Sequence, residues 1–137
     1  MKSFRLYFLY LMLMVTGCVA SLSNIRQSEP AYILHSDKAP EKLANCIAYE
    51  SQAALDSWNR FWDPAKVTEN DGTYKILITL SGGLFVSFSQ PMAELIISPG
   101  SPAGSNIECR TYSYWGGKEK FWDLVKHCAS PQNSPGK

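Results

Sequence analysis

The sequence has almost no charge imbalance and no internal repeat. Among its 137 residues, 13 Lys and Arg stand against 12 Asp and Glu, which leaves a net charge of +1. Near neutrality gives no electrostatic argument for a nucleic-acid partner, because such partners bind surfaces with excess positive charge. The absence of a fixed period argues against solenoids and arrays. A hydrophobic fraction of 45% is nevertheless enough for one packed domain.

The residues and motifs of common catalytic sites are also scarce. Only His35 and His127 can act as bases near neutral pH. The sequence has no G-x-S-x-G nucleophile motif and no Cys-x-x-Cys redox motif, and its paired glycines lack the spacing of a phosphate-binding loop. We therefore expect a non-enzymatic domain with no catalytic residue, no cofactor and no metal.

The N-terminus lacks the roughly 20 apolar residues that a membrane-spanning helix needs. Two cations precede a shorter apolar run, Leu6–Val15, and this pattern predicts a secretory signal peptide. The motif VTGC at residues 15–18 then resembles the bacterial lipobox. This resemblance implies cleavage of residues 1–17 and acylation of the Cys18 thiol. An uncleaved N-terminal anchor, with Cys18 an incidental thiol, is the alternative.

The lipobox resemblance also implies an address and a partner. The acyl chains would attach the protein to a membrane, and two or three chains make such an anchor durable. In enterobacterial lipoproteins, which this motif resembles, the residue after the cysteine is a sorting signal. Asp at that position retains the protein at the inner membrane. Val19 and Ala20 follow here, which implies the outer membrane, facing the periplasm. In a Gram-positive source the same anchor implies the cell membrane.

Composition divides the mature chain into three parts. Residues 18–30 are small and polar after the lipidated cysteine, which predicts a flexible tether. Residues 31–129 contain the periodic apolar segments and are predicted to form one compact domain. Residues 130–137 carry two prolines and no large apolar side chain, which predicts a disordered tail.

Apolar periodicity within the domain switches between 3.6 and 2 residues. Helical spacing over 37–55 and 118–129 predicts two helices, and residues 58–62 form a last turn or a separate short helix. Alternation predicts strands separated by turns at 70–72 and 81–83 and by a break or bend at Gln90-Pro91. The predicted strands are 31–35, 66–69, 73–80, 84–89, 92–98 and 106–115. This order predicts an α+β two-layer sandwich, an antiparallel meander sheet with two helices packed on one face.

The layout resembles that of many small uncharacterised proteobacterial outer-membrane lipoproteins. The shared features are a helix start of the form PEKLANCI at residues 40–47 and a cysteine in the final helix. The resemblance covers most of residues 31–129, and it implies a fold and an address without an activity.

Three cysteines remain after lipidation, and export places them in an oxidising compartment. All three pairings are open, but Cys46 and Cys128 lie on the apolar stripes of two helices expected side by side, so this disulfide is favoured. Cys109 falls on the inward face of a strand and is expected to be a buried thiol. A metal site that adds His127 is disfavoured, because adjacent helical residues point about 100° apart.

Aromatic residues provide the remaining functional signal. Trp58, Tyr112 and Tyr114 are candidates for a binding surface, whereas Trp62 and Trp122 are expected in the core. The favoured function is a small binding or structural domain for an envelope protein or glycan. A small periplasmic hydrolase acting on glycan or peptide, and a lipid- or ligand-carrying domain with an apolar cavity, are the alternatives.

Overall fold

The computed structural model describes residues 21–58, 63, 65–82, 88–113 and 115–131. These residues form three helices and five strands along the chain. In chain order the elements are α2 (Leu22–Gln27), β1 (Tyr32–Ser36), α3 (Pro40–Trp58), β2 (Lys66–Asn70), β3 (Thr73–Gly82), β4 (Phe88–Pro99), β5 (Ser105–Thr111) and α4 (Lys118–Ala129). The predicted tail at 130–137 lies outside the described residues beyond Pro131.

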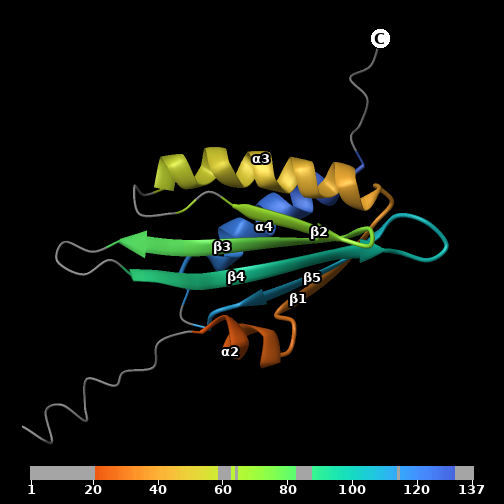
Figure 1. The fold of residues 1–137 in the computed structure, drawn as a ribbon. Helices are drawn as coiled ribbons and strands as arrows, with labels where there is room; N and C mark the ends of the chain where they lie inside the picture. The colour runs from red at the N-terminus through yellow and green to blue at the C-terminus, as the bar shows by residue number, and fades with distance from the viewer. Residues whose placement is uncertain (1–20, 59–62, 64, 83–87, 114, 132–137) are drawn as a thin grey trace, which may run out of the picture.

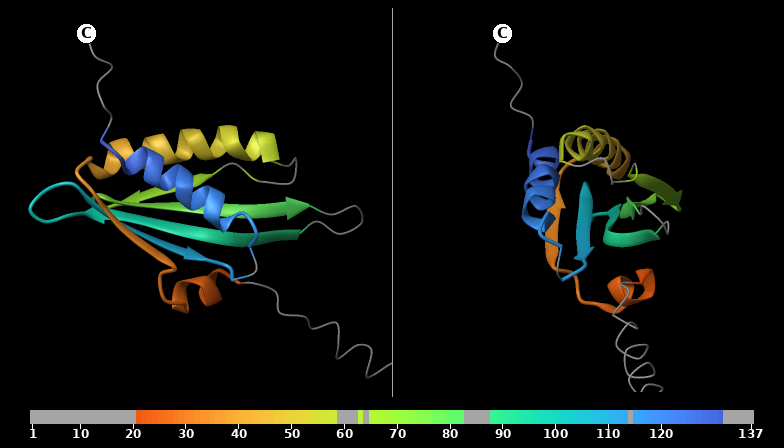
Figure 2. Two further views of the ribbon diagram at one scale, coloured as in Figure 1. Left: turned by 180° about the vertical axis from the view of Figure 1, so that it is seen from behind. Right: turned by 90° about the vertical axis from the view of Figure 1, so that its left-hand side faces the viewer.

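The strands form one antiparallel sheet in the order β1-β5-β4-β3-β2 (Figure 1). Strands β2 to β5 make a continuous meander, and β1 pairs with the outer side of β5. Helices α3 and α4 lie together on one face of this sheet (Figure 2). The α+β prediction, with an antiparallel meander under two helices, is confirmed.

The β2–β3 hairpin forms where the sequence predicted it. Asp71 and Gly72 both have positive φ, at 50° and 73°. Two such residues make the turn whose twist matches that of the flanking strands, and Asp-Gly is a favoured pair for it. The amide of Gly72 also donates to the Glu69 carboxylate at 3.1 Å. The turn residues therefore fix the register of the first hairpin.

Strands β3 and β4 are longer than predicted. The expected turn at 81–83 is wrong at its start, because Ser81 and Gly82 still pair within the sheet. Of the two alternatives for Gln90-Pro91, a break or a bend, the break is wrong, because β4 runs unbroken through it. A register shift places Pro91 opposite Thr79 and leaves Met92 as the extra residue of a bulge. A bulge tolerates proline, which has no amide to donate. Most of the predicted strand 84–89 lies outside the described residues.

Helix α3 and strand β5 have boundaries that differ from the predicted ones by several residues. The α3 helix begins at Pro40 instead of residue 37. Before it, the Ser36 hydroxyl donates to the Ala129 carbonyl at 2.8 Å and accepts from the Lys38 amide at 3.3 Å. Helix α3 ends at Trp58, the first residue of the predicted last turn or short helix at 58–62, and residues 59–62 lie outside the described residues. Strand β5 ends at Thr111, and Trp115 lies beyond it, buried with its ring centre 5.5 Å from that of Phe121. The alternation of side chains continues to Trp115, so the sequence alone did not show that the strand ends at Thr111 and that Trp115 packs in the core beyond it.

The hydrophobic core lies between the sheet and helices α3 and α4. Alternate residues of β3, β4 and β5 point into it, as period-2 strands require, and the helices add one apolar stripe each. Its fully buried side chains are Leu43, Ala44, Ile47, Ile76, Ile78, Ala93, Leu95, Ile97, Ile107, Cys109 and Val125. This core positions both cysteine-bearing helices.

The opposite face of the sheet carries α2, which the sequence did not predict. The flexible tether predicted for residues 18–30 is wrong for residues 22–27, which are helical and in which Ile25 is 3% exposed. Figure 1 shows α2 across the sheet from α3, and it contacts β4 and β5. Ser21 caps α2 by accepting from the Asn24 amide. Tertiary contacts hold a helix too short to be stable alone.

Candidate functional site

The predicted lipidation site, Cys18, lies outside the described residues. The described chain begins three residues later at Ser21, whose hydroxyl accepts from the Asn24 amide at 3.3 Å. The first described element after Cys18 is helix α2, which is fixed on the sheet.

An ion pair fixes α2 to the sheet. The Arg26 guanidinium donates to both carboxylate oxygens of Glu94 on β4, at 2.9 and 2.6 Å to Oε1 and 3.1 Å to Oε2. The Glu94 side chain is 3% exposed and that of Arg26 is 53% exposed. The hydrogen bonds and the charge of Glu94 raise the pKa of Arg26. Bidentate pairing satisfies a buried carboxylate and sets the orientation of the helix.

A second arginine holds the end of α2. The Arg110 side chain on β5 donates through Nε to the Ser28 carbonyl at 3.2 Å and through Nη2 to Glu108 at 3.0 Å. Two strands of the sheet thus contact α2 through charged groups. This arrangement was not predicted, although Ser21 is a typical N-cap and Glu94 interrupts the apolar run Met92–Ile97.

The predicted cysteine pair is at bonding distance on the other face. The Sγ atoms of Cys46 and Cys128 lie 2.09 Å apart and their Cα atoms 5.9 Å apart. The bridge joins α3 to the last turn of α4. Two further contacts hold that turn, because Ser36 and Lys38 donate to the carbonyls of Ala129 and Cys128. One disulfide and two hydrogen bonds therefore hold the C-terminal end of α4.

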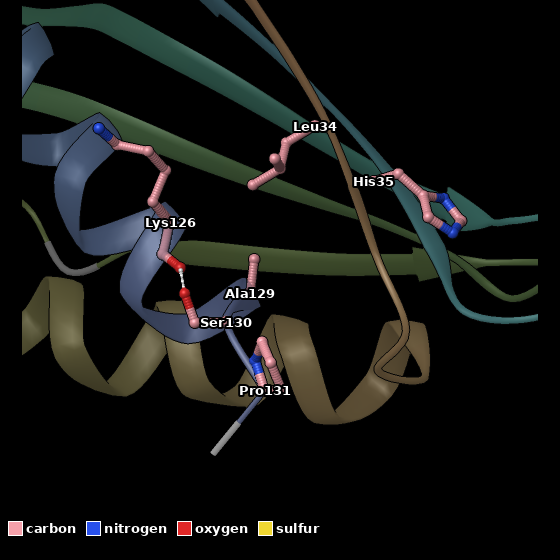
Figure 3. A pocket seen from close by; sticks show the side chains of 6 residues that line it. All are labelled: Leu34, His35, Lys126, Ala129, Ser130 and Pro131. Atoms are coloured by element: carbon pink, nitrogen blue, oxygen red, sulfur yellow. Dashed lines mark hydrogen bonds between the residues drawn. The ribbon is translucent and has the colours of Figure 1, made fainter. Parts of the chain in front are cut away.

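A surface pocket of about 330 Å³ lies beside this end of α4 (Figure 3). Leu34 and Ala129 provide apolar surface, and four of the six lining residues are exposed. Figure 3 shows the imidazole of His35 and the amine of Lys126 pointing away from one another. The lining residues are Leu34, His35, Lys126, Ala129, Ser130 and Pro131.

The ionisable groups of this pocket already have partners. His35 Nδ1 lies 3.0 Å from Asn106 Oδ1, and Lys126 Nζ lies 2.7 Å from Asp123 Oδ1. General acid–base catalysis needs such groups within reach of one substrate atom. The side chains of His35 and Lys126 point away from one another (Figure 3). The pocket is therefore suited to a shallow binding contact and not to proton transfer by these two groups together.

A second pocket, of about 360 Å³, lies on the other side of residues 130–131 and against the disulfide. Glu50 and His127 face it together with Lys38, whose amine donates to the Cys128 carbonyl. Cys46 is half-buried there and Cys128 is buried. This pocket does not favour the alternative of a metal site. Cys46 and Cys128 are bonded to each other, whereas a metal ion is bound by free thiolates.

Cys109 is the buried thiol that the strand pattern indicated. It is fully buried among core side chains, and burial raises its pKa to about 12. A thiol with this pKa stays protonated near neutral pH, and the thiolate is the reactive form. Cys109 therefore belongs to the core as a small apolar side chain.

Only part of the candidate aromatic surface falls within the described residues. Tyr112 is half-buried and packs against the core, Trp58 ends α3, and Tyr114 lies outside the described residues. Trp122 lies in the core as expected, stacked on Tyr32 at 4.8 Å between ring centres. Trp62 lies outside the described residues. The binding role of Trp58, Tyr112 and Tyr114 stays a prediction.

Comparisons with known proteins give no match. No protein-family model, no curated protein and no solved structure shows significant similarity to the chain. Within the described ranges, no helix is long and apolar enough to cross a membrane, and no group of three or more His, Cys, Asp or Glu side chains is placed to hold a metal ion.

Proposed function

We propose that this protein is a lipid-anchored envelope protein whose small domain faces the periplasm and has a binding or structural role. The observation that carries this proposal is the Cys46–Cys128 pair at bonding distance. Disulfides persist in exported proteins and are rare in the cytosol, where thiols are kept reduced. The pair therefore supports the export that residues 1–18 predict from an independent part of the chain.

Both described pockets flank the fixed end of α4. The geometry of the first supports binding over catalysis, because its ionisable groups are engaged with neighbours and diverge. A hydrolase would bring such groups together over one substrate bond. A domain fastened by a disulfide, a core and two arginine contacts is instead suited to presenting a rigid surface. The partner chemistry that we propose is an envelope protein or glycan.

Metabolic labelling with radioactive palmitate tests the anchor. Wild-type protein should incorporate the label and partition with membranes, whereas Cys18→Ser should remain unlabelled. The matched control is Cys109→Ser, which removes a thiol from the core and should leave labelling intact. Label in Cys18→Ser would contradict the assignment of this cysteine. In an enterobacterial host, Val19→Asp should shift the labelled protein to the inner membrane.

Crosslinking in intact cells tests the binding role. The acylated protein, captured after crosslinking, should carry a defined envelope protein or glycan that Cys18→Ser carries less of. Recovery of neither above background would count against binding. Turnover of purified peptidoglycan fragments by the wild-type protein, lost on His35→Gln, would favour the hydrolase alternative instead.

A further inference from the structure

We infer that the sheet face bearing α2 lies against the phospholipid bilayer and contacts its headgroups. This inference rests on the proposed acylation of Cys18. It adds to that proposal the orientation of the domain and the surface that contacts lipid. Three observations carry it: the length of chain before α2, the fixation of α2, and the composition of the surrounding sheet face.

The chain between the proposed anchor and α2 is short. Only residues 19–21 separate Cys18 from Leu22, the first residue of the helix. Four residue steps of extended chain reach at most about 14 Å. The headgroup layer on each side of a bilayer is itself about 5–8 Å thick. Helix α2 must therefore lie at, or just outside, the lipid surface.

Because α2 is fixed to the sheet, its position orients the whole domain. Ile25 is 3% exposed, Arg26 is paired with Glu94, and Arg110 contacts the Ser28 carbonyl. A free tether would let the domain rotate above the membrane. A fixed α2 instead places its own face of the sheet toward the lipid, with α3 and α4 on the far side (Figures 1 and 2).

The strand residues on the sheet face that bears α2 are suited to contact with an anionic, partly apolar surface. Pairing aligns one row across this face, with Ile33 on β1, Lys75 on β3 and Thr68 on β2 as its exposed members. Ile33 is 70% exposed. The complete row is Ile33, Glu108, Ile96, Lys75 and Thr68.

The charges of this face favour headgroup phosphates. Its two strand carboxylates, Glu94 and Glu108, are each paired with an arginine, so their charge is compensated. Lys66 and Lys75 are exposed on the same face and add positive charge. Basic side chains near a membrane are attracted by anionic lipids. Exposed Ile33 adds apolar contact of the kind that inserts between headgroups.

The test places a fluorophore on either side of the domain in the full acylated protein, reconstituted into vesicles of phosphatidylethanolamine and phosphatidylglycerol. Ile33→Cys reports on the α2 face and Tyr49→Cys, on α3, reports on the far side. The two sites are matched in exposure, at 70% and 76%. A quencher attached to lipid headgroups should quench the label at residue 33 several-fold more strongly than the label at 49. Replacing phosphatidylglycerol by phosphatidylcholine should reduce that difference.

A variant that releases α2 tests the cause of the orientation. Arg26→Gln removes the partner of Glu94, so the free chain should lengthen toward β1 and the difference in quenching should fall. Lys126→Gln, a cation on α4 across the domain, is the matched control and should leave the difference unchanged.

Failure of the two proposals can be told apart. Wild-type protein without palmitate label would overturn the proposed anchor and this orientation with it. Labelled protein with equal quenching at both sites, or stronger quenching at residue 49, would overturn the orientation alone. Disulfide-linked dimers formed by unlabelled Ile33→Cys protein in quencher-free vesicles would assign this face to a second copy of the chain and overturn the lipid contact.

Discussion

The two faces of the sheet hold their helices by different physical means. On one face, α3 and α4 bury an apolar core and are joined by the Cys46–Cys128 pair. On the other, α2 has one fully buried apolar side chain, Ile25, and is held by Arg26–Glu94. Core burial is spread over many side chains, whereas the attachment of α2 is concentrated in very few. The first face carries global stability, and the second can open locally.

This difference separates what stabilises the domain from what orients it. A change on the α3–α4 face should shift the unfolding of the whole domain. A change on the α2 face should release one short helix and leave the rest folded.

Loss of the disulfide should have the largest effect. Cys46 and Cys128 are separated by 82 residues, and closing a loop of that length stabilises by about 4–5 kcal/mol in the chain-entropy model. Replacing either cysteine by serine should lower the free energy of unfolding by about 2–5 kcal/mol, the usual range for native disulfides. Urea denaturation measures this change, and non-reduced peptide mapping should show the remaining thiol alkylated. Asn45→Ser, exposed on the same helix, should change stability little.

A disulfide peptide containing Cys109 would contradict this arrangement. Equal stability of Cys46→Ser and wild type would show that the core alone holds α3 against α4.

Alkaline pH should weaken the same face through Cys109. Burial raises the pKa of this thiol to about 12 from an ordinary value of 9.0. Above pH 9 the unfolded chain loses the thiol proton while the folded protein keeps it, so stability falls as pH rises toward 12. The full effect is on the order of 4 kcal/mol, because a tenfold change in proton affinity is worth about 1.4 kcal/mol. Stability measured from pH 8 to pH 11 should fall more steeply for wild type than for Cys109→Ala. Parallel curves would show that the thiol ionises without this penalty.

Breaking the α2 ion pair should have a smaller and more local effect. Arg26→Met leaves the Glu94 carboxylate buried without its bidentate partner, which costs about 1–3 kcal/mol. Because Arg26 is half-exposed, water that reaches Glu94 after α2 detaches limits the loss. Hydrogen exchange should show faster exchange in residues 24–28, with β3 and β4 protected as in wild type. The double variant Arg26→Met/Glu94→Met should recover part of the lost stability, because it leaves no unpaired charge. Uniformly faster exchange across the sheet would mean that α2 is part of the global core.

The elements with strong periodicity were predictable from the sequence. Helix α4 and the Asp71-Gly72 hairpin follow from local patterns, and the cysteines on two apolar stripes indicated their pairing. Helix α2 was not predictable in the same way. It spans six residues and depends on Glu94, which lies 68 residues from Arg26. An ion pair of that sequence separation leaves no periodic signal on either segment.

The β3–β4 region shows a second limit. A proline and a run of serine and glycine indicated an end to both strands, but the bulge at Met92 absorbs Pro91 and the ladder continues. Whether a proline ends a strand depends on the pairing of its neighbours, which a single segment does not encode. The pockets beside α4 depend likewise on how β1, α3 and the last turn of α4 meet.

The smallest expected effect comes from an exposed polar contact on the α3–α4 side. The Tyr32 hydroxyl donates to Glu119 at 2.7 Å, and this hydrogen bond is the main cause that raises the pKa of Tyr32 to about 12. Glu119→Gln removes the negative acceptor, so the pKa of Tyr32 should fall toward its ordinary value of 10.0. Ultraviolet titration of phenolate absorbance measures this change, with Tyr32→Phe identifying the responsible band. Near neutral pH, stability should change by less than about 0.5 kcal/mol, because solvent competes for an exposed pair. Above pH 10 the sign reverses in favour of the variant: the wild-type folded state resists ionisation of Tyr32 that its unfolded chain undergoes, and the variant resists it less. A loss at neutral pH as large as that of Arg26→Met would erase the contrast between the faces, since an exposed contact would then stabilise as much as a buried one.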